Sequence, residues 1–490
     1  MDKSTSLLIG AALFLVASLV NAFARRPHRG FADYFALPAR IGPVVLALTI
    51  LGTLVGGGIV VGLVEIGAKG GVVGAVLGLG YALAFLILAS LAGRLRAMTV
   101  DIGVVSLFDL LDMRCPEQYR VPVLGVVVTV SRLFAAVYFA SYFFILAAQV
   151  VVVSTFIQTF APGLGHAKAV LTVGALLYAL NTVLYTAWGG IEKDIRTDIF
   201  QMGLVAVFVV GLTTLSVVGT GGNVAALKTL PGEFFDGTGY GVAFLVVALL
   251  APFPSLFVRL DLWQRIIAGQ SVVALKRAFY LVALACVLVF SLFAFVGMYA
   301  RANIPDVVQA PERAVYLLVD GSRNGWAGGM LLICLFAAVL SSADTFLNAA
   351  SVSLSRVWFR REWALIPKWS IDSKTDSRAE KSLRRKVSFV TLGVGIVSVV
   401  LGVILGDVVA LLIGALSALT VLFPVCLVVV LGKDVKVREA FWSVAMGLSV
   451  FLLVVFGFGM AEVAFLPAFL VSGAVFVAMR LFGRRAARSR

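Results

Sequence analysis

The sequence predicts an all-α integral membrane protein with about thirteen transmembrane helices. Of the 490 residues, 61% are hydrophobic and only 13% are charged, and the mean hydropathy is +1.06. Soluble domains are only about half apolar, so this composition argues against an ordinary soluble fold. Apolar runs near the roughly 20 residues that cross a bilayer as a helix recur along the whole chain. They do not show the alternation of apolar and polar residues that is typical of membrane β-barrel strands.

Reading each apolar run as a helix gives the expected spans. They cover residues 6–24, 42–66, 71–92, 121–153, 167–186, 195–219, 239–264, 277–300, 327–356, 386–405, 408–431, 440–459 and 463–482. We expect the first span to be a retained helix rather than a signal peptide. Its arginines, Arg25 and Arg26, follow the apolar run, whereas a signal peptide carries its positive charge before the run.

Basic residues mark alternate connections between these spans. They are Arg25, Arg26, Arg29 and Arg40, then Arg94 and Arg96, then Lys193 and Arg196, then Arg265, Lys276 and Arg277, then "RVWFRREW" and "KSLRRK", then Lys433, Lys436 and Arg438, and last "GRRAARSR". About three quarters of all Lys and Arg fall on this one side, which is expected to be cytoplasmic. The sequence thus predicts a multi-pass protein of the cell (inner) membrane, with its N-terminus outside and its C-terminus cytoplasmic. The polar stretch 365–380 is expected to be a cytoplasmic loop.

The same charge distribution accounts for the net charge of +15, so we expect the lipid bilayer and not nucleic acid as a partner. The four cysteines are scattered and form no metal-ligand spacing. Both histidines, His28 and His166, fall in expected loops, which argues against an intramembrane histidine metal site. The sequence contains no P-loop and no HExxH motif, and no nucleophile–base pairing is evident, so an enzyme is not expected.

Two spans carry residues that break helices near the middle of the bilayer. The second contains "LGTLVGGGIVVG", with Gly56, Gly57 and Gly58 in a row, and the seventh contains "LLAPFPSLF", with Pro252 and Pro254. Glycine lowers helix propensity and proline removes a backbone donor. Close helix packing is an alternative explanation for the glycines. The spans are five helices apart, as expected if spans two to six and seven to eleven form two inverted repeats.

The ninth span contains "LFAAVLSSADTFLNAAS", residues 335–351, with unusually many polar side chains for a membrane segment. At 100° per residue the small and polar residues fall within an arc of roughly 160°. They are Ala338, Ser341, Ser342, Asp344, Thr345 and Asn348. A single serine often bonds back to its own helix, but an intramembrane carboxylate points to function. Hydroxyls opposite the carbonyls of a broken helix form a nearly neutral oxygen cage, which suits Na⁺ better than a divalent ion.

The chain resembles the sodium:solute symporter family, which includes the proline permease and the sodium/glucose cotransporters. The stretches that carry the resemblance are "FADYFALPARIGPVVLALTILGTLVGGG", "YTAWGGIEKDIRTDIFQ", "DLWQRIIAG" and "AAVLSSADTFLNAAS". The resemblance implies a leucine-transporter-type 5+5 inverted repeat and symport driven by a sodium gradient. One transporter domain over 1–490 would then comprise an extra N-terminal helix (6–24), a first repeat (42–219), a second repeat (239–431) and two C-terminal helices (440–482).

The resemblance also implies where ions bind. The main sodium site would take backbone carbonyls of Gly52, Val55 and Ala338 with the hydroxyls of Ser341 and Ser342. A second sodium site would involve Asp198 with Ser342 and Thr345, and Asp344 is a further candidate. An alternative for Asp198 is a carboxylate that interacts with a helix dipole.

The substrate region departs from sugar-transporting relatives. The stretch after the first break offers almost no side-chain hydrogen bonding, whereas a buried sugar needs many donors and acceptors. An organic acid, an amino acid or a quaternary amine is therefore favoured as the small-molecule substrate. Candidate substrate residues are Gly56, Gly57, Gly58, Gln149, Phe253 and Ser255, and candidate pocket or gate residues are Glu65, Arg132, Tyr138, Tyr142 and Trp263. A transporter-like sensor that signals through a partner is the alternative function.

Overall fold

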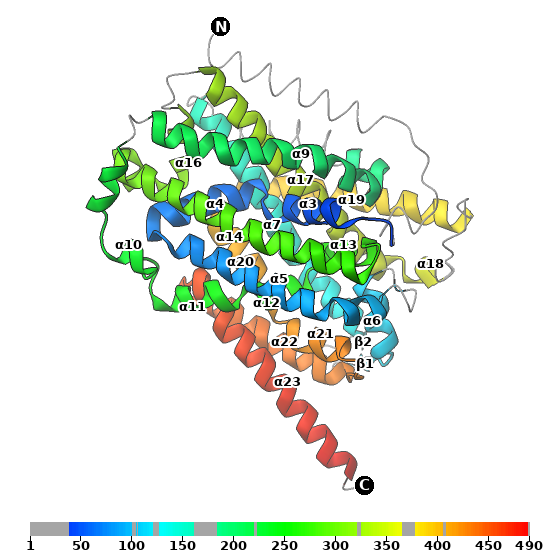
Figure 1. The fold of residues 1–490 in the computed structure, drawn as a ribbon. Coiled ribbons are helices and arrows are strands. Elements are labelled where there is room, and N and C mark those ends of the chain that lie inside the picture. The colour runs from blue at the N-terminus through cyan, green and yellow to red at the C-terminus, as the bar shows by residue number, and fades with distance from the viewer. Residues whose placement is uncertain are drawn as a thin grey trace.

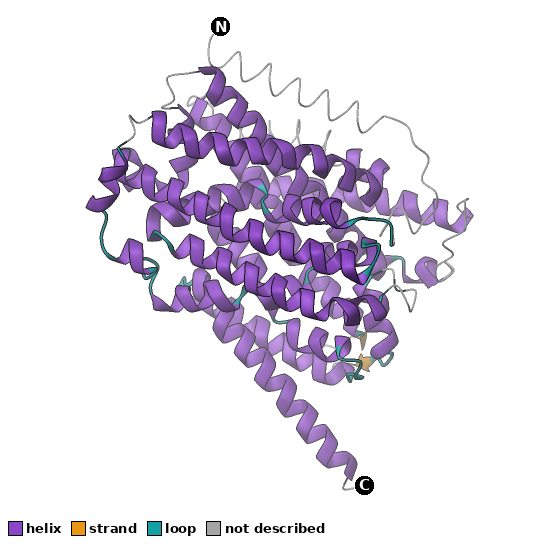
Figure 2. Ribbon diagram, viewed as in Figure 1, coloured by secondary structure: helices purple, strands orange, loops and turns teal. Residues whose placement is uncertain are grey.

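The computed structural model describes residues 39–99, 104, 106–120, 127–160, 184–219, 223–320, 325–364, 378–404 and 408–488. Helices dominate this part of the chain (Figure 2), and the described strands β1 (Tyr119–Arg120) and β2 (Val127–Val128) form one antiparallel ribbon. The expected span 6–24, most of span 167–186, both histidines and residues 365–377 of the expected loop lie outside the described residues.

Eight described helices are long and apolar enough to cross a membrane, and three bent helix pairs bring the spans to as many as eleven. Each overlaps one expected span. In chain order they are α3 (Pro43–Leu54) with α4 (Gly57–Gly70), α5 (Val73–Ala97), α7 (Val130–Phe160), α9 (Leu184–Gly219), α11 (Val242–Leu250) and α12 (Pro252–Val258) with α13 (Leu260–Ala268), α14 (Val272–Asn303), α17 (Gly325–Trp358), α19 (Arg378–Ile404), α20 (Val408–Thr420) with α21 (Phe423–Val430), α22 (Val437–Leu452), and α23 (Phe465–Arg488).

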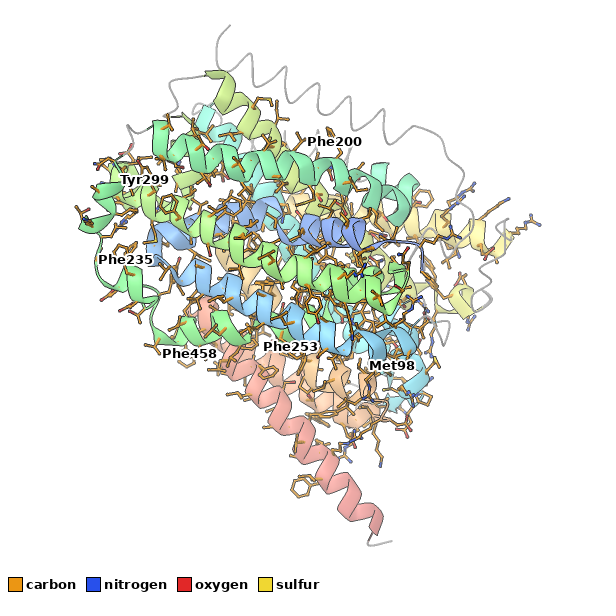
Figure 3. All side chains as sticks on the ribbon, viewed as in Figure 1. Met98, Phe200, Phe235, Phe253, Tyr299 and Phe458 are labelled. Carbon is orange, nitrogen blue, oxygen red and sulfur yellow. The ribbon has the colours of Figure 1, made fainter. Side chains whose placement is uncertain are left out.

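Short helical segments lie between and beside these spans. They are α6 (Leu107–Arg114), η2 (Val224–Thr229), α10 (Glu233–Asp236), α15 (Pro305–Gln309), η3 (Pro311–Arg313), α16 (Ala314–Asp320), α18 (Arg360–Ala364), η4 (Leu453–Gly457) and η5 (Ala461–Val463). In Figure 1, α10 and α16 lie at one end of the bundle, and α6, α18 and the β-ribbon lie at the other. In Figure 3, Phe235 and Tyr299 mark the first end and Met98 marks the second.

Two of the bends equal each other in angle and fall in the two spans expected to be broken. The α3–α4 pair bends by 63° at Val55–Gly56, and the α12–α13 pair bends by 63° at Arg259. The first break lies beside the glycine run, as predicted. These two bends give the second and seventh spans the same broken geometry, five spans apart.

The position expected for the second break was wrong. Pro252 and Pro254 fall in the first turn of α12, where a missing N–H costs little because no preceding turn needs it. Ala251 keeps helical dihedral angles, and the chain turns only at Arg259, which is extended. The expected span 408–431 also bends, by 47°, between Thr420 and Phe423.

Two expected starts differ from the observed ones. The fourth span begins at Val130 rather than residue 121, because Val127 and Val128 pair with β1 instead of continuing the helix. The sixth begins at Leu184 rather than 195, since the polar residues of "IEKDIRTD" continue the helix. A carbonyl–amide ladder can run through polar residues at a helix end, where hydropathy falls before helicity does.

α17 occupies the centre of the molecule. It packs against α3, α7, α9 and α19, and α14 packs against α3, α4 and α5. Of the most apolar window of Ile333–Trp358, 94% is buried inside the protein, compared with 22% for Phe465–Phe482. α23, red in Figure 1, accordingly extends away from the body of the bundle. The polar face of the ninth span therefore lies inside the protein and away from lipid.

Candidate functional site

The first element of the site is the break between α3 and α4. Val55 and Gly56 join the two helices, and every residue from Thr49 to Gly58 is buried. Gly56 is extended, with φ −74° and ψ 167°, and Val55 N–H donates back to Leu51 O at 2.7 Å. A helix end presents carbonyls that no following turn satisfies, and such groups at membrane depth occur where protein or a site surrounds them. The break thus brings backbone oxygens into the core.

The polar residues of α17 form the opposite wall. Ser341, Ser342 and Thr345 are fully buried, and Asp344 and Asn348 are nearly so. Ser342 Oγ donates within its own helix, to Ala338 O at 3.2 Å or Val339 O at 3.1 Å. This is the back-bonding that a membrane serine ordinarily makes. Ser341 instead donates away from the helix, to Asp198 Oδ1 at 2.5 Å.

The break and α17 approach each other at two glycines. A Cβ added to Gly52 would lie 2.6 Å from Ser341 Oγ, and one added to Gly56 would lie 2.3 Å from Ser342 Oγ and 3.7 Å from Ala338 O. A Cβ on Gly57 would lie 2.0 Å from Val339 Cγ2. Only glycine allows so close an approach of backbone to side chain. The structure therefore brings together the five residues expected at the main sodium site.

Asp198 lies at the back of this site, on α9. Its Oδ1 accepts from Ser341, and its Oδ2 accepts a short hydrogen bond from Thr49 Oγ1. Arg265 Nη2 lies 3.6 Å from Oδ2, and both ionic side chains are buried. Arg265 also donates to Thr345 Oγ1 at 2.8 Å and to Thr49 Oγ1 at 3.3 Å. A buried carboxylate is tolerated where a cation and donors surround it in this way.

Arg265 and Thr49 are the residues that sequence reasoning missed. Arg265 was assigned to a basic cytoplasmic connection, and that assignment was wrong: its side chain is 1% exposed. The error follows from the broken seventh span, because α13 continues beneath the core after the turn at Arg259. The i,i+4 spacing of Asp261 and Arg265 on one short helix is the signal that indicated a buried polar face.

Asp198 and Thr345, both expected at a second ion site, thus meet through Arg265. Thr53 Oγ1 also lies 3.5 Å from Thr345 Oγ1 and 3.1 Å from Thr49 O. Asp344 is buried next to Thr345 in sequence, but the contacts just described for Asp198 do not include it. The carboxylate of Asp198 joins the main site, through Ser341, to the second broken span, through Arg265.

A partly open cleft with about 710 Å³ of empty space lies beside the α3–α4 break, among α4, α5, α11, α12 and α20. Its lining residues are Gly58, Ile59, Gly62, Leu63, Ile66, Leu77, Tyr81, Phe244, Val247, Ala248, Ala251, Pro252, Ser255, Leu412, Ile413, Leu416, Ser417 and Thr420. Among these described residues there is no Asp, Glu, Lys or Arg, and four hydroxyl groups supply the polar side chains. Apolar clefts with a few placed polar groups are typical of small-molecule sites.

The structure divides the candidate substrate residues. Gly58 and Ser255 line the cleft, and Gln149 lies next to it because its Oε1 accepts from Gly58 N–H at 3.2 Å. Gly56 and Gly57 instead face α17. The ring of Phe253 packs 5.6 Å from Phe257 and 5.6 Å from Phe423 and is not among the lining residues.

The other candidate gate residues lie around the second break. Tyr142 Oη accepts from Leu260 N–H at 3.0 Å and donates to Asp261 Oδ1 at 3.1 Å. Tyr138 Oη donates to Val258 O, and Trp263 Nε1 donates to Phe257 O at 2.8 Å. These contacts satisfy backbone groups that the turn at Arg259 releases. Glu65 pairs with Lys69 on α4, and Arg132 donates to Val127 O in the β-ribbon, outside the cleft.

Residues 34–447, most of the chain, match the sequence model of the sodium:solute symporter family. The chain belongs to the sodium:solute symporter family. The expected resemblance is thereby confirmed: the protein is a multi-pass membrane transporter and not an enzyme, and its class of activity is sodium-coupled symport. The family implies Na⁺ as the coupling ion and a solute as the cargo.

Individual relatives agree with this membership. The symporter is 24% identical over 368 residues to a sodium/proline symporter of Salmonella typhimurium (strain LT2), covering 72% of this chain and 70% of the relative. It superposes on a Na⁺-coupled sialic acid symporter in a substrate-bound outward-open state, with TM-score 0.71, 16% identity and 98% of each chain covered. It also superposes on Mhp1, a nucleobase-cation-symport-1 family transporter in a closed conformation, with TM-score 0.54, 14% identity and coverage of 92% and 96%. These likenesses show the leucine-transporter-type fold that the sequence predicted.

Proposed function

We propose that this symporter imports a small organic solute by alternating access and that the Na⁺ which drives import binds between the α3–α4 break and α17. Its ligands would be the carbonyls of Gly52, Val55 and Ala338 and the hydroxyls of Ser341 and Ser342. The observation that carries the proposal is the close approach of Gly52 and Gly56 to those two serines.

The chemistry of the donor set supports a monovalent cation. All five proposed ligands are neutral oxygens, and hard oxygen ligands suit hard cations. A divalent ion usually needs carboxylates in its coordination shell. Asp198 lies behind Ser341 and accepts its hydrogen bond. The resulting negative charge near the serine favours a cation without adding a direct carboxylate ligand.

Sodium binding to the purified chain tests this site without knowledge of the substrate. The double variant Ser341→Ala with Ser342→Ala removes two proposed ligands. Since a hydrogen-bond-type contact to a charge contributes about 1.5–3 kcal/mol, we expect at least a tenfold rise in the sodium concentration that half-saturates thermal stabilisation. Ser353→Ala is the matched control, because Ser353 is buried on the same helix and bonds to Ala349 O. Unchanged sodium affinity in the double variant would refute the site.

We place the solute in the cleft beside Gly58 and Ser255. The apolar lining with four hydroxyls supports a compact solute with a small polar part, such as an amino acid, an organic acid or a quaternary amine. Proline, the solute named for the Salmonella relative, fits this description better than sialic acid, whose many hydroxyl groups would lack partners there. Gly56, Gly57, Gln149 and Phe253 are second-rank candidates beside the cleft.

A thermal-shift screen identifies the solute, because a ligand of the folded state raises its apparent stability. Proline, other amino acids, organic acids and quaternary amines are tested in Na⁺ and in K⁺. We expect a shift that appears only in Na⁺, followed by sodium-dependent uptake of the same compound into proteoliposomes. A transporter with sodium-independent uptake of its solute would contradict the proposal.

We propose further that the end of the bundle with α6 and α18 is cytoplasmic. Arg94, Arg96 and Arg114 each donate to backbone carbonyls at helix ends of that region. This end then carries the C-terminus. We retain residues 42–219 and 239–431 as the two repeats, supported by the two 63° bends that begin them. Accessibility of single introduced cysteines to a membrane-impermeant reagent in intact cells tests the orientation.

A further inference from the structure

The Asp198 cluster contains every group that a second sodium site would need, and it also contains a cation of the protein itself. Thr49, Ser341 and Thr345 supply hydroxyl oxygens and Asp198 supplies the charge. The guanidinium of Arg265 reaches Asp198 and both threonines from α13. We propose that Arg265 is a tethered cation that takes the place of a second sodium ion, so that this chain binds one Na⁺ at a time. The inference rests on the main sodium site proposed above.

The hydrogen bonds of the cluster support this assignment. The shortest polar contact of Thr345 Oγ1 described here is the one it accepts from Arg265 Nη2, at 2.8 Å. Thr49 Oγ1 accepts from Arg265 Nη2 and Nε and donates to Asp198 Oδ2. The oxygens that would coordinate a second ion are thus engaged by the guanidinium.

Charge and burial support it as well. Asp198 and Arg265 are buried at 0% and 1% exposure, so their charges are poorly screened and largely cancel each other. A sodium ion added beside the guanidinium would place two positive charges against one carboxylate. Like charges repel strongly in a medium of low dielectric constant, so the occupied cluster disfavours a second metal ion.

The arrangement also assigns Arg265 a positioning role. Asp198 accepts from Ser341 with one oxygen and faces Arg265 with the other. Arg265 belongs to α13, the far half of the second broken span. The guanidinium therefore fixes the carboxylate that orients a sodium ligand, and it connects the ion site to the second break.

The test is the number of ²²Na⁺ ions bound at saturation by the purified full-length chain, with Arg265→Ala as the main variant. We expect one ion per chain in the wild type and two in Arg265→Ala, because the variant leaves a carboxylate and three hydroxyls for an ion. Adding Asp198→Asn to Arg265→Ala should return the count to one. Arg259→Ala is the matched control, since Arg259 is an equally buried arginine that pairs with Asp261, and it should stay at one.

Two ions bound by the wild type would overturn the inference, and so would a well-folded Arg265→Ala that still binds one. The wild-type count decides the question even if Arg265→Ala fails to fold. Ser341→Ala with Ser342→Ala separates the two proposals. Loss of the single ion in that variant supports the main site, whereas a wild type that binds no sodium refutes the proposed function itself.

Discussion

Gly56→Ala tests whether the close approach of the α3–α4 break to α17 forms the ion site. The added methyl would lie 2.3 Å from Ser342 Oγ and 2.4 Å from Ser342 Cβ, whereas ordinary van der Waals contact begins at 3.4 Å. Rotating the serine moves its Oγ but not its Cβ. The separation of the break from α17 must therefore open from 2.4 Å to at least 3.4 Å, by about 1 Å.

Overpacking of this kind costs about 1–3 kcal/mol. If the sodium-bound state requires the close approach and the sodium-free state can relax, the whole strain falls on the bound state. At about 1.4 kcal/mol for each factor of ten, sodium affinity should fall by about five- to 150-fold. The loss arises although Gly56 contributes no ligand of its own to the proposed site.

The assay is the sodium concentration that gives half of the maximal thermal stabilisation of the purified protein. Gly393→Ala is the control, because Gly393 lies on the exposed side of α19 and a methyl added there would meet nothing within 4 Å. A helical glycine replaced by alanine at such a place gains about 0.5–1 kcal/mol, and sodium affinity should not change. Wild-type sodium affinity in a folded Gly56→Ala would refute the reasoning.

Three further predictions concern the rest of the described chain. Tyr142→Phe should cost about 1–3 kcal/mol, because it leaves the buried Leu260 N–H without its acceptor; a lower apparent melting temperature checks this, with the exposed Tyr280→Phe as a neutral control. Burial raises the pKa of the Cys115 thiol to about 12, so Cys115 should resist maleimide at pH 8 and react after unfolding, and fast labelling of the native chain would contradict its burial. The hydrogen bond from Lys386 holds the pKa of Glu362 below its ordinary 4.5. The stability that this pair adds is therefore present above pH 4.5 and is lost as the pH falls through the lowered value. Melting temperatures of wild type and Glu362→Gln should converge in acid, and an equal difference at all pH values would oppose this.

The sequence predicted the first break and the polar face of α17 because both depend on local rules. Three consecutive glycines weaken a helix wherever they occur, and the 3.6-residue period places Ser341, Ser342 and Thr345 on one side of any helix. Lipid enforces helical spans, so the apolar runs alone located the spans that the structure describes.

The second break and the role of Arg265 were not accessible in the same way. Proline interrupts a helix interior but not its first turn, and only the structure shows which of these applies to Pro252 and Pro254. Whether an arginine near the end of an apolar run faces the cytoplasm or a buried carboxylate depends on residues far away in the sequence.

The sequence by itself determined a sodium:solute symporter fold and the residues able to form a sodium cage, because period, composition and motif are local properties of the chain. Only the tertiary structure decided that Gly52 and Gly56 lie against Ser341 and Ser342, and that Asp198 faces Arg265. These are contacts between α3, α9, α13 and α17. Their free energy comes from charge pairing and close packing across helices, which no single segment encodes.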